Sequence, residues 1–209
     1  MMMMGLSRNT LWTSYFLHYY TLFLVSVSIL TFVFCAPLTA NGAIINYSQW
    51  SVVWFFLMLY GTSLISIGFM VSTWFNSSSA TAAATTVILF VMYSPFNFIA
   101  NDLDGVSYDS KVFCSLSSPV AMALGCGLIS SWESKAIGLQ WGNLATRVSA
   151  SDQLTMSVIF QMLILDTILY YVFARYVDLV KERSSTFKTD ISPSRPARPQ
   201  RDIVYFVEL

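Results

Sequence analysis

The side chains that could perform chemistry are few, and they lie far apart in the sequence. The chain has a single histidine, His18, and three cysteines, Cys35, Cys114 and Cys126, none in a C-x-x-C spacing. Metal sites and disulfide frameworks need several such residues at short spacings. No G-x-S-x-G motif accompanies them. The sequence therefore predicts no catalytic residue, no cofactor-binding residue and no metal site.

Asp166 is the ionisable residue that most needs an explanation, because it lies near the middle of a long apolar run. A carboxylate at the centre of a bilayer costs roughly 2.5–3.5 kcal/mol on insertion scales. Two interpretations follow. Asp166 either accepts a structural hydrogen bond from a Ser, Thr or Tyr of a neighbouring helix, or it takes part in coupling or substrate passage.

The composition indicates an integral, multi-pass membrane protein. Of 209 residues, 56% are hydrophobic and 11% charged, whereas soluble domains carry about 25% charged residues. The net charge of zero excludes nucleic-acid binding driven by overall charge. A membrane-spanning helix needs about 20 apolar residues. Four runs satisfy this length clearly: about 11–34, 49–72, 80–100 and 154–174.

A further apolar run, 112–131, decides the topology. Basic residues near the ends of spans favour the cytosol. Arg8 precedes the first run, and six basic residues follow the last: Lys181, Arg183, Lys188, Arg195, Arg198 and Arg201. Both termini are therefore expected in the cytosol, which requires an even number of crossings. The bilayer concerned is left open.

Residues 112–153 are accordingly predicted to form a re-entrant helical hairpin on the outer side. The hairpin would turn near Gly125 and Gly127, or between Trp132 and Gly138. Such a segment must be shielded by protein, so we expect it to pack among the four spans. A fifth complete crossing is the alternative. Residues 181–209, which are basic and contain three prolines, are expected to form a flexible cytosolic linker.

The segment LSSPVAMALGCGLISSWESKAIGLQWGNL (residues 116–144) resembles the stretch before the last span in each half of A-subfamily ABC transporters, which are mostly lipid exporters. The residues that carry the resemblance are Leu116, Ser118, Pro119, Gly125, Glu133, Gly138, Gln140, Trp141 and Asn143. Residues 3–16, which include Gly5, are similar to the family's cytosolic coupling helix and third transmembrane helix. Residues 69–84 and 161–180 are similar to later blocks in the same order.

The resemblance implies an all-α integral membrane fold of the type-2 ABC exporter architecture. Residues 1–180 would be a partial transmembrane domain, a fragment of one half, and residues 181–209 would lead toward a nucleotide-binding domain. The implied partners are the bilayer, a lipid substrate, that domain with its ATP and Mg²⁺, and a second membrane half. The candidate coupling or structural residues are Asp166, Glu133, Gln140, Trp141, Asn143 and Gly5. Of these, Gln140, Trp141 and Asn143 are expected to fix the hairpin rather than contact lipid.

The sequence departs from the family pattern in one respect that bears on activity. No G-x-x-x-x-G-K-[ST] phosphate loop occurs, and this loop is what holds the phosphates in such ATPases. The chain is therefore expected to hydrolyse no ATP alone. The rival interpretation is a small four-helix membrane scaffold or accessory subunit without transport activity. Substrate identity, transport direction and the choice of half are not encoded in these motifs.

Overall fold

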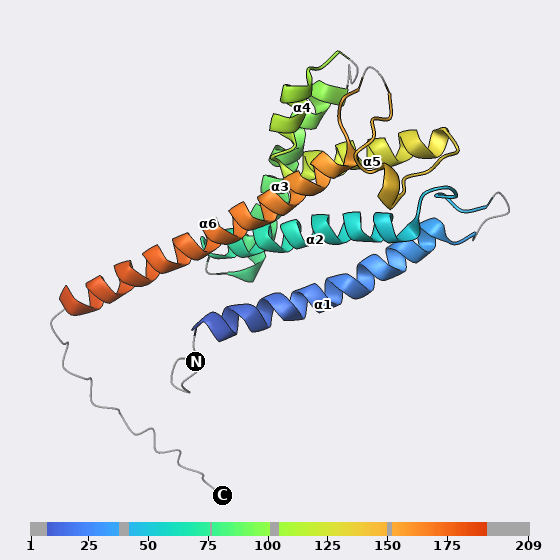
Figure 1. The fold of residues 1–209 in the computed structure, drawn as a ribbon. Helices are drawn as coiled ribbons and strands as arrows, with labels where there is room; N and C mark the ends of the chain where they lie inside the picture. The colour runs from blue at the N-terminus through green and yellow to red at the C-terminus, as the bar shows by residue number, and fades with distance from the viewer. Residues whose placement is uncertain (1–7, 38–41, 76, 101–104, 150–151, 192–209) are drawn as a thin grey trace, which may run out of the picture.

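The computed structural model describes residues 8–37, 42–75, 77–100, 105–149 and 152–191, and its elements are helices (Figure 1). In chain order they are α1 (Arg8–Cys35), α2 (Trp50–Ser72), α3 (Ser78–Ala100), α4 (Tyr108–Cys114), α5 (Ser118–Ser134), the 3-10 turn η2 (Trp141–Asn143) and α6 (Met156–Ile191). Gly5 and residues 192–209 lie outside the described residues.

Four of these helices are long and apolar enough to cross a bilayer. The candidate spans are Thr13–Cys35, Trp50–Ser72, Ser78–Ala100 and Met156–Lys181. The prediction of a helical membrane protein with four spans is confirmed at this level. α1 begins and α6 ends toward the same side of the bundle (Figure 1), as an even number of crossings requires.

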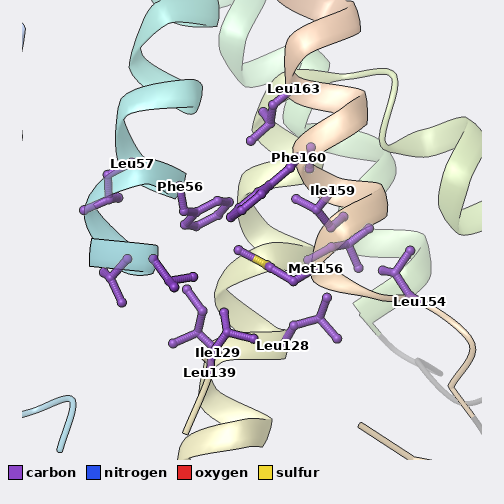
Figure 2. Packing of buried hydrophobic residues seen from close by; sticks show 14 of the residues in the cluster. Phe56, Leu57, Leu128, Ile129, Leu139, Leu154, Met156, Ile159, Phe160 and Leu163 are labelled. Carbon is purple, nitrogen blue, oxygen red and sulfur yellow. The ribbon is translucent and has the colours of Figure 1, made fainter. Parts of the chain in front are cut away.

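The core lies where α2, α5 and α6 meet (Figure 2). Phe56 of α2 stacks on Phe160 of α6, with ring centroids 6.3 Å apart. Gly125 of α5 faces this pair, and a Cβ added there would lie 2.5 Å from the Phe56 ring. Small residues let helices approach closely in lipid. The glycine therefore brings α5 against α2 and α6.

The turn between α4 and α5 lies at Ser115–Ser117, so the expected turn near Gly125 and Gly127 is wrong. Both glycines are inside α5. Pro119 explains the position of the break, because it lies in the first turn of α5, where its missing N–H costs nothing. The second expected position, between Trp132 and Gly138, corresponds to the end of α5 at Ser134.

This α4–α5 turn contacts three of the spanning helices near their middles. The Ser117 hydroxyl donates to the Met92 carbonyl of α3 at 2.6 Å. The Tyr170 hydroxyl of α6 donates to the Leu116 carbonyl at 3.2 Å. The Ser118 hydroxyl is hydrogen-bonded to that of Ser63 in α2, and both side chains are fully buried. The polar groups of the turn are thus satisfied by the helices around it.

The end of α6 also differs from the sequence-based expectation. α6 continues to Ile191 instead of ending near residue 174, so the predicted linker from residue 181 begins as helix. The reason is that no proline or glycine occurs between Asp166 and Ile191 to interrupt the helix. The prolines come later, outside the described residues.

α1 contacts the bundle mainly through α2 and otherwise exposes its apolar side chains. Phe23 lies over Gly61, where an added Cβ would be only 1.6 Å from the ring. Trp54 also donates its indole N–H to the Ser28 hydroxyl at 3.1 Å. Gly61 therefore sets the point at which α1 crosses α2.

Candidate functional site

The carboxylate of Glu133, at the end of α5, holds the loop between α1 and α2. Its Oε1 accepts hydrogen bonds from the backbone N–H groups of Asn46 and, at 2.7 Å, Tyr47. Its Oε2 accepts from the Ser48 N–H at 3.1 Å and from the Ser48 hydroxyl at 2.8 Å. Successive N–H groups converging on one anion form a nest-like site, here filled by a side chain.

These hydrogen bonds also set the ionisation of Glu133. Burial alone would raise the pKa of the carboxyl, but the donors from Tyr47, Ser48 and Asn46 outweigh burial. The pKa of Glu133 therefore lies below its ordinary value. Hydrogen bonding to the charged form has this effect because protonation would remove acceptors from the donors.

Behind Glu133 the two chain segments touch through their backbones. The Gln49 N–H donates to the Leu139 carbonyl at 2.9 Å, and the Leu139 N–H donates to the Ser48 hydroxyl at 2.9 Å. Gly138 has a φ of +73° and lies so close that an added Cβ would be 2.1 Å from the Tyr47 carbonyl carbon. Both the conformation and the contact require glycine.

The turn η2 completes this contact. The Gln140 N–H donates to Asn143 Oδ1 at 2.7 Å, and Asn143 Nδ2 donates to the Gly138 carbonyl at 2.9 Å. Trp141 donates its indole N–H to the Ser51 hydroxyl at 2.9 Å. We call residues 46–51 and 132–143 together the hairpin–loop interface.

An ion pair joins α4 to the segment that precedes α6. Lys111 Nζ lies 2.9 Å from Asp152 Oδ1, and the Lys111 side chain is 3% exposed. The same oxygen accepts from the Leu154 N–H at 3.0 Å. A buried charge without its partner is costly, so this pair fixes α4 relative to the start of α6.

Asp166 is fully buried in α6, and neither carboxylate oxygen has a hydrogen-bond partner among the described residues. The expected hydrogen bond from a hydroxyl of a neighbouring helix is therefore not found there. The hydroxyls of Thr167 and Tyr170, which follow Asp166 on α6, donate instead to the Leu163 and Leu116 carbonyls.

The fold thus brings four of the candidate residues, Glu133, Gln140, Trp141 and Asn143, into one interface and leaves Asp166 apart on α6. Sequence reasoning missed their partners in the loop, including Ser48 and Ser51. It also missed the pairing of Lys111 with Asp152. Both are contacts between distant segments, and no local motif indicates them.

The hairpin–loop interface is structural in its chemistry. Its carboxylate, hydroxyls and amide are engaged in hydrogen bonds within the interface, mostly with backbone groups. The described residues include no cluster of three or more His, Cys, Asp or Glu that could hold a metal ion. The sequence also lacks a phosphate loop, so the residues present do not fit ATP with Mg²⁺. The geometry fixes helices and offers no reacting group.

Replacing Gly138 by alanine should destabilise the hairpin–loop interface. The left-handed backbone alone costs a non-glycine residue about 1–3 kcal/mol, and the added methyl group would also collide with Tyr47. We expect a lower Tm of the purified protein in detergent. Gly142→Ala is the matched control, because a Cβ there meets nothing within 4 Å. Equal Tm values for the two variants would contradict this account of Gly138.

Replacing Glu133 by glutamine should weaken the same interface in a pH-dependent way. The amide nitrogen of glutamine cannot accept, and hydrogen bonds to a charged group contribute about 1.5–3 kcal/mol. The pKa of Glu133 is lower in the folded than in the unfolded chain. Its stabilising contribution is therefore complete at neutral pH and is lost as the pH falls through the lowered pKa.

The measurement for Glu133→Gln is the difference in Tm from the unaltered chain between pH 7 and pH 3. We expect the difference to be largest at pH 7 and to shrink in acid. A difference that is constant with pH would show that the charge of Glu133 does not hold the loop.

No protein-family model matches the chain. The chain is 35% identical over 180 residues to the human phospholipid-transporting ATPase ABCA3. The aligned residues make up 86% of the chain and 11% of ABCA3. It is 30% identical over 176 residues to the human retinal-specific phospholipid-transporting ATPase ABCA4, covering 84% and 8%.

The human phospholipid-transporting ATPase ABCA7 is 32% identical over 177 residues, 85% of the chain and 8% of that protein. The chain thus spans about a tenth of the length of the curated relatives that it matches. The similarity extends over more than four fifths of the chain. The chain belongs to the A subfamily of ABC transporters.

Proposed function

We propose that this chain is membrane-spanning machinery of an ATP-driven transporter that moves phospholipids between the leaflets of a bilayer. The observation that carries the proposal is the identity of 30–35% with ATPases that are named for phospholipid transport. The relatives do not favour the scaffold or accessory-subunit interpretation. ATP hydrolysis would be supplied by a nucleotide-binding domain outside these residues, and a second membrane half would complete the path.

The proposal includes a type-2 exporter architecture in which α4 and α5 form a re-entrant hairpin. The contacts of the α4–α5 turn with Met92, Ser63 and Tyr170 support this, because they put the turn near the middle of three spans. The contact of Glu133 with the α1–α2 loop supports the return of α5 to the side from which α4 enters. Together with the basic residues from Lys181 onward, at and beyond the end of the last candidate span, this favours an outer hairpin and cytosolic termini.

In this arrangement the hairpin–loop interface closes the outer end of the helix bundle. Glu133, Gly138 and Trp141 would hold α5 against the start of α2, so that the spans tilt as one body when the ATPase domains act. Asp166 lies apart from this interface and is buried on α6. We assign it a role in how α6 packs in the bundle, since its carboxyl is shielded from the lipid-facing surface.

A graft tests the function. Residues 8–181 would replace the matching stretch of human ABCA3, and the chimera would be reconstituted in liposomes with a nitrobenzoxadiazole-labelled phospholipid. We expect ATP-dependent movement of the probe between leaflets, measured by dithionite quenching, and its loss with Glu133→Ala in the graft. A folded chimera that hydrolyses ATP at the parental rate but moves no lipid would contradict the proposal.

Cysteine labelling tests the topology. In a chain whose native cysteines are replaced by alanine, single cysteines would be introduced for Ile44, Ser134 and Ser77, which are exposed. A membrane-impermeant maleimide added to intact cells should label the first two and should label Ser77→Cys only after permeabilisation. Labelling of Ile44→Cys and Ser134→Cys from opposite sides would mean that residues 112–131 cross the bilayer.

A further inference from the structure

A groove between α1 and α2 has no role in the proposed transport. It is bounded at one end by Phe23 over Gly61 and at the other by Phe69, whose ring lies 6.0 Å from that of Phe16 and 6.2 Å from that of Tyr19. Its volume is about 660 Å³. That is within the range of roughly 300–1,000 Å³ found for small-molecule sites.

The groove exists because a glycine, with no side chain, lies at its base. Gly68 lines it, and an added Cβ would meet no atom within 4 Å. Gly61 lies two turns earlier on α2 and is covered by Phe23. One of these glycines thus allows α1 and α2 to touch, while the other leaves space where the two helices separate.

The lining of the groove favours an apolar occupant along most of its length. Three serine and threonine hydroxyls line it beside Tyr15 and Tyr19, and each of the three is already bonded to a backbone carbonyl of its own segment. Ser26 donates to Leu22 at 3.0 Å, Ser72 to Phe69 at 2.8 Å and Thr81 to Ser77 at 3.0 Å. A bound water needs two to four polar partners, which this lining does not supply. The remaining surface is largely aromatic and aliphatic.

The groove is continuous with the hydrocarbon of the bilayer. Its lining residues on α1 and α2 lie within the candidate spans Thr13–Cys35 and Trp50–Ser72. An unfilled space of this size would cost the dispersion contacts of every side chain around it. The surrounding lipid supplies flexible apolar chains at high concentration, so the open side of the groove admits them directly.

One end of the groove is suited to a lipid headgroup. Ser72 lines that end, and the Lys181 ammonium donates to the carbonyl of the next residue, Thr73. Tyr15 also lines the groove and is half exposed, and tyrosine favours the headgroup level. The Lys181 ammonium and the Tyr15 phenol could bind the phosphate of a lipid whose acyl chain lies in the groove.

We propose that this groove holds one acyl chain of a bilayer phospholipid as a resident lipid of the α1–α2 pair. The lipid fills the space over Gly68 and completes the packing of α1, the spanning helix that crosses α2 at Gly61. The inference does not depend on the proposed function, because binding here requires neither ATP nor movement of lipid between leaflets.

Photocrosslinking tests the resident lipid. The chain would be reconstituted without nucleotide into vesicles containing phosphatidylcholine with a diazirine on one acyl chain, and crosslinked peptides would be mapped by mass spectrometry. We expect enriched crosslinks on residues 15–26 and 65–72. Gly68→Leu should lower them several-fold, because an added Cβ there meets no atom within 4 Å and the rest of the leucine side chain would occupy the groove.

Gly127→Leu is the matched control, since Gly127 is also open to an added Cβ but lies on α5. It should leave the groove crosslinks unchanged. Equal crosslinking in Gly68→Leu and the unaltered chain would overturn the proposal. So would an unlabelled groove beside strong labelling of the exposed face of α6, which would mean that a protein segment fills the groove. If Gly68→Leu lowers the Tm, Leu22→Trp, at an exposed lining position, replaces it.

Discussion

The carboxylate of Glu133 satisfies three consecutive backbone N–H groups of the segment between α1 and α2. Irregular backbone near a bilayer is stable only when its polar groups find partners within the protein. The segment after α5 also has irregular backbone, and it hydrogen-bonds to the α1–α2 segment: the Leu139 carbonyl accepts from Gln49, and the Leu139 N–H donates to Ser48. The positions of α5, α2 and the start of α6 depend on these hydrogen bonds between the two segments.

Three glycines show how differently the same residue type can serve one membrane fold. Gly125 and Gly61 remove side chains so that large aromatic rings, Phe56 and Phe23, can lie against a helix. Gly138 supplies a left-handed backbone at a point where another backbone passes. The sequence shows only that each is glycine, and only the neighbouring segment reveals which property is used.

The four spans could be predicted because a bilayer imposes a length and an apolar composition that are visible in one segment at a time. The position of the turn between α4 and α5 could not. Gly125 and Gly127 resemble turn residues, whereas the break at Ser115–Ser117 depends on Pro119 and on hydrogen-bond partners from α2, α3 and α6. The motif residues Gln140, Trp141 and Asn143 were found through resemblance. The contact of Trp141 with Ser51 and the unpartnered state of Asp166 depend on long-range packing that a single sequence does not encode.

The ion pair between Lys111 and Asp152 joins residues 41 positions apart, so everything between them forms a ring closed by a noncovalent bond. The entropy of closing such a ring grows only with the logarithm of its length, about 0.6 kcal/mol for each doubling. Lengthening this ring by a few residues would therefore change the entropy of closing it by less than about 0.6 kcal/mol. The pair between α4 and the start of α6 would still close the larger ring at nearly the same cost.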